Sequence, residues 1–226
     1  VANGVLDIGS LLDGTGDAIL LEPSPRYFTP NILPVEFDAT AKAPKFLKFL
    51  TEVLPKKEDG DNRRRIVQEM FAYCLAGRSL RLEKLFILHG TGSNGKSILV
   101  IILRALLGDG NVSGLTLDQF HKQFLVGGLV GMLANIGADM GVIDNADESI
   151  LKLISSFDAM LIDIKHKSPI TVRVFAKLLF LTNSLPRFRD SSNGTIRRLV
   201  LIPFLEQFDE DRKDVDLHTA LLTELP

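Results

Sequence analysis

The chain has 226 residues, a formal net charge of -2 and 46% hydrophobic residues, the composition of an ordinary globular protein. This charge excludes a surface that is basic throughout, so a contact with nucleic acid would depend on a local cluster of cations. The single cysteine, Cys74, excludes an intrachain disulfide and is expected to be buried in a helix. No apolar run reaches the roughly 18 residues of a membrane-spanning helix, so we expect no membrane partner.

Short strands and turns are expected at the start of the chain. Three apolar stretches are separated there by Gly and Pro, the residues that punctuate strands. The stretches are Val5–Ile8, Ala18–Leu21 and Val35–Phe37. We interpret residues 1–38 as a β-rich lead segment.

Two helices are predicted next. From Pro44 the apolar residues recur at helical spacing, until Pro55 ends the run. A charged linker over 56–65 leads to a second helix at about 64–76. Residues 39–84 are therefore expected to form a helical lead-in, or collar.

Strands and helices alternate through most of the remaining chain, which is typical of a mostly parallel sheet. Short apolar runs predict buried strands at 85–88, 132–138, 177–182 and 199–204. Helices are predicted over 96–107, over 117–124 with Thr116 as the cap, and over 148–157. Residues 160–174 have the pattern of a β-hairpin.

A phosphate-binding loop is predicted between the strand at 85–88 and the helix at 96–107. Residues 90–97 match the pattern G-x-x-x-x-G-K-[S/T] in full. Three glycines let the backbone approach the phosphates, and the helix N-terminus favours the anion. Lys96 would supply a cation to the β- and γ-phosphates, and Ser97 a hydroxyl to Mg²⁺. The nucleotide-binding residues are thus expected to be Gly90, Gly92, Asn94, Gly95, Lys96 and Ser97.

Polar residues end two of the other predicted strands. Asp139 follows the strand at 132–138 and is the acid expected to help hold Mg²⁺ and orient the attacking water. The other acids nearby are interpreted as surface charges: Asp144, Asp147 and Glu148. Asn183 follows the strand at 177–182, where an amide can contact a γ-phosphate or its attacking water, although it could equally form the turn before Pro186.

Taken in order, these motifs resemble those of the superfamily 3 helicases, AAA+ ATPases of phage, plasmid and poxvirus-type primase-helicases. Residues 90–97 resemble the Walker A loop, 134–139 the Walker B strand, 156–167 the third motif, 180–186 the sensor strand and 195–204 the arginine-finger segment. Two departures stand out. The third motif reads Ser156-Phe157-Asp158 instead of the usual Gly-Gly-Asp, and the Walker B strand ends in a single acid.

The resemblance implies an α/β fold with an AAA+ P-loop NTPase core at 85–204 and a mostly parallel sheet. The small β segment (1–38) and the helical lead-in (39–84) would precede this core, and a truncated C-terminal segment (205–226) would follow it. A primase portion would lie on the same full-length chain.

The resemblance also implies an ATP-dependent DNA helicase of phage or mobile-element replication, with ATP and Mg²⁺ as cofactors. Such a protein would form a homo-oligomeric ring, a hexamer, on single-stranded DNA in the cytoplasm of a bacterial host or virus-infected cell. The implied catalytic residues are Asp139, Asn183, Arg197 and Arg198, the protein ligands of the metal are Ser97 and Asp139, and the DNA contacts at the hairpin tip are Lys165, His166 and Lys167.

Two other functions stay open at this stage. The chain could be an ATP-driven switch that remodels proteins, or a nucleotide-binding scaffold that hydrolyses too slowly to matter. Stimulation of hydrolysis by DNA would separate these from a helicase. The run Arg63–Arg65, interpreted as a solvated helix start, is the alternative DNA contact.

Overall fold

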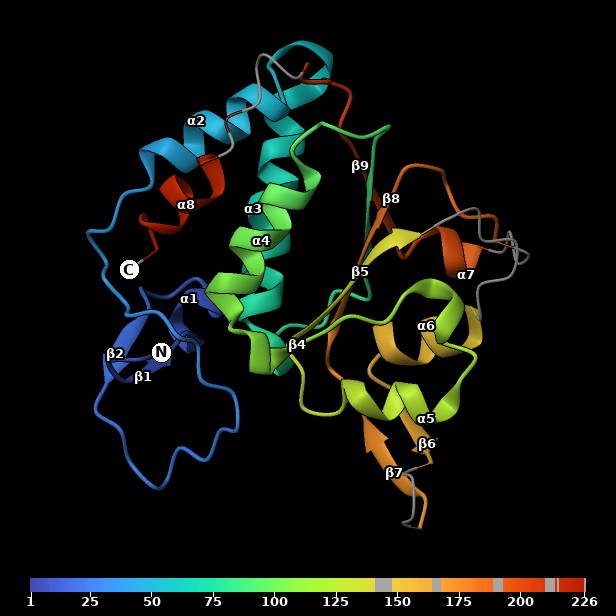
Figure 1. The fold of residues 1–226 in the computed structure, drawn as a ribbon. Helices are drawn as coiled ribbons and strands as arrows, with labels where there is room; N and C mark the ends of the chain where they lie inside the picture. The colour runs from blue at the N-terminus through green and yellow to red at the C-terminus, as the bar shows by residue number, and fades with distance from the viewer. Residues whose placement is uncertain (141–147, 164–167, 189–192, 210–213, 215, 226) are drawn as a thin grey trace.

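The computed structural model describes residues 1–140, 148–163, 168–188, 193–209, 214 and 216–225. Its centre is one sheet whose five strands are all parallel, as the alternation of strands and helices predicts (Figure 1). In spatial order the strands are β4 (Val112–Ser113), β5 (Ala134–Met140), β8 (Lys177–Thr182), β3 (Leu85–His89) and β9 (Leu199–Pro203).

Helices cover both faces of this sheet. One face packs against α3 (Gly60–Leu75) and α4 (Lys96–Leu107), and the other faces α5 (Gln123–Val126), α6 (Glu148–Ser155) and α7 (Asn193–Ile196) (Figure 1). Because side chains alternate along a strand, β8 contributes to two cores. Leu179 joins the α3 and α4 side, and Phe180 joins the opposite cluster.

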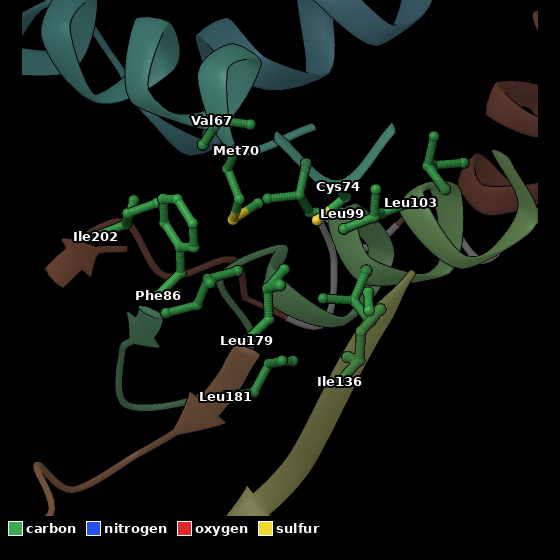
Figure 2. Packing of buried hydrophobic residues seen from close by; sticks show 14 of the residues in the cluster. Val67, Met70, Cys74, Phe86, Leu99, Leu103, Ile136, Leu179, Leu181 and Ile202 are labelled. Atoms are coloured by element: carbon green, nitrogen blue, oxygen red, sulfur yellow. The ribbon is translucent and has the colours of Figure 1, made fainter. Parts of the chain in front are cut away.

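The larger core lies between the sheet and helices α3 and α4. Met70 and Cys74 of α3 meet Leu99 and Leu103 of α4 above Leu179 (Figure 2). Cys74 is fully buried, which confirms the prediction, and burial raises the pKa of its thiol to about 12. A thiol that stays protonated at neutral pH is a poor nucleophile, so Cys74 is a packing residue.

Two antiparallel pairs stand outside the main sheet. The predicted hairpin at 160–174 is confirmed: β6 (Ala159–Ile162) pairs with β7 (Ile170–Arg173) and projects from the body of the molecule (Figure 1). Near the N-terminus, β1 (Val5–Asp7) pairs with β2 (Ile19–Leu21), and the short helix α1 (Gly9–Asp13) lies between them in sequence.

Helix α2 (Pro44–Val53) begins at Pro44, as its apolar spacing predicts, and lies beside α8 (Leu217–Leu222) (Figure 1). The backbone N–H groups of Lys45 and Phe46 donate to the two carboxylate oxygens of Glu224, each over 2.9 Å. A carboxylate at this end of α2 also interacts favourably with the helix dipole. The C-terminal segment therefore fixes the direction of α2.

Three sequence predictions need correction. Residues 117–124 form a 3-10 turn (Leu117–Gln119) and then α5, because Lys122 is extended with φ -91° and ψ 92° and interrupts the helix. Helix α3 starts inside the expected linker, at Gly60, where a Cβ would lie 1.8 Å from the carbonyl oxygen of Pro55. Residues 35–37 form no strand, since the Phe37 N–H donates to the side chain of Asn3.

Candidate functional site

The predicted phosphate-binding loop joins the carboxyl end of β3 to the start of α4. A Cβ on Gly90 would lie 2.1 Å from the side-chain nitrogen of Asn94 and 2.5 Å from the carbonyl oxygen of Phe204. Gly95 has a left-handed φ of +85°, and a Cβ there would meet Val53 of α2 at 2.5 Å. Steric limits therefore select glycine at both positions.

Lys96 is held against this loop by neutral oxygens. Its ammonium donates to the carbonyl of Gly90 over 2.6 Å, to Oδ1 of Asn94 over 3.0 Å and to Oδ1 of Asn183 over 3.4 Å. Lys96 is only 6% exposed, and a buried ammonium is stable only when such partners are present. The structure thus brings together Lys96 from the Walker A segment and Asn183 from the sensor strand.

A cavity of ≈ 750 Å³ opens beside the loop. The loop residues, Ser97 among them, line one end of it, and helices α2 and α8 line the other with Phe49, Val53 and Leu217. Its volume lies within the range of small-molecule sites, which combine apolar walls with a few placed polar groups. The loop side of this cavity is therefore polar and cationic, and the helix side combines apolar residues with Lys45, Lys48 and Glu52.

The segment after β9 also supports the loop, and sequence reasoning missed it. The N–H of Phe204 donates to the carbonyl of His89 over 2.7 Å, and the N–H of Phe208 donates to the carbonyl of Ser93 over 2.8 Å. Gln207 adds a side-chain bond to Thr91 Oγ1 over 2.7 Å. Each of these bonds joins residues more than a hundred positions apart in the sequence, so no local sequence pattern predicts them.

The predicted metal-binding acid, Asp139, lies near the end of β5, the neighbour of β8. The register between these strands shifts between Gly137 and Met140, and Met140 pairs with Thr182 just before Asn183. The backbone of Asp139 is therefore on the strand next to the sensor strand. The side chain of Asp139 and residues 164–167, which include Lys165, His166 and Lys167, lie outside the described part, so their assigned roles stay predictions.

Arg197 and Arg198 lie just before β9, at the edge of the sheet opposite the phosphate-binding loop. The side chain of Arg198 is 10% exposed and donates to Ser156 Oγ over 2.6 Å and to the carbonyl of Gly194 over 2.5 Å. That of Arg197 is 61% exposed and forms an ion pair with Glu83 at 2.8 Å. The two predicted arginines thus differ: Arg198 is built into the fold, and Arg197 faces solvent.

The run Arg63–Arg65 is not a free basic patch, and its interpretation as a solvated helix start was wrong for Arg63. Arg63 is 5% exposed and donates to the carbonyl of Pro203 over 2.7 Å. Arg64 bonds to the carbonyl of Leu54 and to Asp61, and Arg65 pairs with Glu69 at 3.1 Å.

The fold and this site define a P-loop NTPase core of the AAA+ type. The glycine-shaped loop, the lysine held at its mouth and the adjoining cavity fit a nucleotide triphosphate, and Ser97 lines the same cavity as a candidate Mg²⁺ ligand. No helix in the described ranges is both long and apolar enough to cross a membrane.

Comparisons with known proteins agree with this class. Residues 88–198 match a family of unknown function, DUF5906. Over 217 residues the chain is 28% identical to a helicase-like protein of Acanthamoeba polyphaga mimivirus, and the match covers 91% of this chain. The apo structure of the NrS-1 C-terminal region aligns with 92% of the chain at a TM-score of 0.62 and 15% identity, and a second structure of that region gives 0.58.

The chain is therefore similar to a helicase-like protein in sequence and to the NrS-1 C-terminal region in fold, in agreement with the resemblance of its motifs to those of superfamily 3 helicases. It spans 21% of the mimivirus relative and 47% of the NrS-1 region. At 15% identity the structural likeness concerns the fold alone.

Proposed function

We propose that this module is the ATP-hydrolysing motor of a ring-forming DNA helicase, acting on single-stranded DNA in the replication of a phage or mobile element. The observation that carries the proposal is the contact of Lys96 with the loop and with Asn183 at the mouth of a nucleotide-sized cavity. The mimivirus relative is helicase-like, and this chain matches 21% of it. A primase portion on the same full-length chain is part of the proposal.

In this proposal the phosphates lie along the loop and the base lies between α2 and α8. Lys96 exchanges neutral oxygens for phosphate oxygens, which form stronger, charge-assisted bonds. Ser97 and Asp139 would hold Mg²⁺, which would supply positive charge to offset that of the phosphates. Asn183 orients the attacking water or contacts the γ-phosphate. Replacing Asp139 by Asn is expected to preserve ATP binding and to slow hydrolysis.

Hydrolysis is proposed to need a neighbouring subunit. Strand β9 separates Arg197 from the phosphate-binding loop by five residues, or roughly 16 Å at about 3.3 Å per residue. An arginine side chain cannot span that distance, so Arg197 would reach only the nucleotide of an adjacent copy, as arginine fingers supplied in trans do. Its exposure makes Arg197 the better candidate than Arg198. A closed ring, with hexamer as the expected number, supplies such a neighbour at every site.

The hairpin β6–β7 is proposed to carry the DNA contact at its tip, with Lys165, His166 and Lys167. It projects from the body of the module, where a central channel of a ring would receive it (Figure 1). Around a ring, a few cations per subunit would add up to a basic channel despite the net charge of -2.

The test is ATP turnover measured with and without single-stranded DNA over a range of protein concentrations. We expect turnover per subunit to rise with concentration, because assembly completes the site, and to rise further with DNA. Turnover that DNA leaves unchanged would favour the protein-remodelling function. A chain that binds ATP and does not turn it over under either condition would be a scaffold.

A further inference from the structure

Three arginines lie near aromatic rings at the edge of the sheet opposite the cavity, where β3, β8 and β9 begin. Arg81 has its guanidinium carbon 4.2 Å from the ring centroid of Phe157, and Arg173 has its carbon 6.0 Å from the same centroid. Arg78 lies 5.3 Å from the centroid of Phe175. We call Arg78, Arg81 and Arg173 the arginine edge.

The backbone of Phe157, which carries two of these arginines on its ring, has an uncommon conformation. Its φ of +59° is left-handed, which costs a bulky residue free energy and which glycine adopts freely. Arg173 donates to the Phe157 carbonyl over 2.9 Å, and Arg81 covers the ring. A simple turn after α6 would be better served by glycine. The aromatic ring packs against the larger core and also carries the guanidiniums of Arg81 and Arg173, two contacts that glycine could not make.

The charges of the arginine edge lack local compensation. All three side chains are exposed, and no carboxylate of the described residues forms an ion pair with any of them. A fourth cation, Lys177, is buried nearby, with its ammonium 4.1 Å from the Tyr73 centroid and bonded to the carbonyl of Leu80 over 2.8 Å. The pKa of Lys177 is lowered to about 8, mainly because the ammonium is buried and to a smaller extent because Arg81 is also positively charged. Cations that repel one another at an exposed surface are stabilised by an anion bound between them.

We propose that the arginine edge binds the sugar–phosphate backbone of a nucleic acid strand beside the base of hairpin β6–β7. A guanidinium has five N–H donors, so Arg81 over its ring, and Arg173 with one N–H bonded to the Phe157 carbonyl, can still donate to the oxygens of a phosphate. The pocket beside Arg78 and Arg81 has a volume of only ≈ 10 Å³, so cations spaced along this surface suit a polymer better than a small ligand enclosed in a cavity. Cations that contact phosphates carry no sequence information directly, so we expect the contact to be independent of base sequence.

This inference deepens the proposed function, because it gives the strand a second contact that is separate from the hairpin tip. Arg173 belongs to β7 and Arg81 precedes β3, so the site joins the hairpin to the main sheet. A nucleic acid strand bound there would contact both the hairpin and the main sheet. The proposed site does not depend on the roles of Lys165 to Lys167.

The test is the binding of a fluorescently labelled oligo(dT) to the full chain, followed by anisotropy over a range of salt concentrations. The double variant Arg81→Gln/Arg173→Gln removes two cations, and Arg78→Gln removes one without touching the hairpin. The control Arg26→Gln/Lys42→Gln removes two exposed cations elsewhere. Thermal melts establish that each variant is folded.

We expect the logarithm of affinity to depend less steeply on the logarithm of salt, by about 0.7 for each phosphate that a variant no longer neutralises. The double variant should therefore flatten the slope by about 1.4, Arg78→Gln by about 0.7, and the control by much less. Should the double variant and Arg78→Gln both keep the wild-type affinity and slope, or should the wild type fail to bind oligo(dT), the proposal would be overturned. Weaker binding of an acidic peptide by the variants, with oligo(dT) binding unchanged, would identify a protein partner and overturn it too.

Binding of a fluorescent ATP analogue is measured on the same variants. We expect it to stay within about twofold of the wild type, because the arginine edge lies across the sheet from the cavity. Failure of the nucleotide assay in every chain would count against the proposed function alone. Unchanged oligo(dT) binding by the variants, with the wild type binding normally, would count against the arginine edge alone, whereas a wild type that does not bind oligo(dT) would count against both proposals.

Discussion

The two edges of the central sheet place positive charge in opposite ways. At the carboxyl edge one ammonium, that of Lys96, is buried beside a cavity and held by neutral oxygens. At the amino edge several guanidiniums, those of Arg81 and Arg173 among them, are exposed and supported by aromatic rings. A single desolvated cation with a cavity suits one small anion, whereas a row of exposed cations suits a polymer. The same parallel sheet thus separates the proposed nucleotide site from the proposed nucleic acid site.

The largest expected effect is on ATP turnover, and it distinguishes the two neighbouring arginines of the amino edge, Arg197 and Arg198. Arg197→Ala should lower ATP turnover by on the order of 1000-fold and leave the fold intact, because its side chain is exposed and would act on the adjacent subunit. Arg198→Ala should instead destabilise the chain by about 3 kcal/mol, since it removes buried bonds to Ser156 and Gly194. Turnover and urea denaturation of both variants measure these effects.

A mixing experiment provides the control for the arginine comparison. Arg197→Ala combined with Lys96→Ala should recover part of the activity, because one interface then pairs an intact loop with an intact finger. If Arg197→Ala turns over ATP at the wild-type rate, the finger assignment is wrong.

The next effect compares two glycines with nearly the same backbone angle. Gly95 in the loop has φ +85° and a Cβ there would lie 2.5 Å from Val53, whereas Gly131 has φ +84° and open space around it. Gly131→Ala should cost about 1 kcal/mol of stability from the left-handed conformation alone. Gly95→Ala should cost about 3 kcal/mol, since overpacking adds to the same strain. Equal shifts of the two urea midpoints would show that α2 does not press on the loop.

The smallest effect is a pH dependence that arises at the amino edge. The pKa of Lys177 is about 8 in the folded chain against an ordinary 10.5, so between these values the unfolded chain binds more protons and stability rises with pH. Cys74 acts in the opposite direction above pH 9, because burial raises its pKa from 9.0 to about 12. The free energy of unfolding should therefore rise by about 1 kcal/mol between pH 8 and pH 9 and then level off.

Two variants separate the contributions of Lys177 and Cys74 to this pH dependence. Lys177→Met should abolish the rise, and Cys74→Ala should let it continue toward about pH 10.5. Urea denaturation at several pH values checks both. An unchanged pH profile in Lys177→Met would assign the effect to another group.

Sequence predicted those parts of the fold and site that depend on short-range chemistry. The loop at 90–97 and the strand that ends before Asn183 were predictable, because glycine spacing and apolar runs are local, and parallel strands bring their carboxyl ends together. The prediction of one helix over 117–124 was wrong, because apolar spacing alone does not distinguish one helix from a 3-10 turn followed by a shorter helix.

Contacts between distant segments could not be predicted. Glu224 holds the start of α2 from 178 and 179 residues away, and Gln207 bonds to Thr91 across 116 residues. The burial of Arg63 likewise depends on a carbonyl at the end of β9, 140 residues further on. A local charge pattern therefore described Arg63 wrongly. The roles of Asp139 and of Lys165 to Lys167 stay predictions.

The most direct test of the account is a calorimetric titration of ATP with Mg²⁺ into the wild-type chain and into Lys96→Ala, with Lys122→Ala as an exposed control. The account predicts one nucleotide per chain for the wild type and for Lys122→Ala, and an affinity lower by on the order of 100-fold for Lys96→Ala, because the phosphates lose their charge-assisted bonds. Equal affinities in Lys96→Ala and the wild type would mean that the nucleotide, if bound, lies somewhere other than this loop, and would contradict the account.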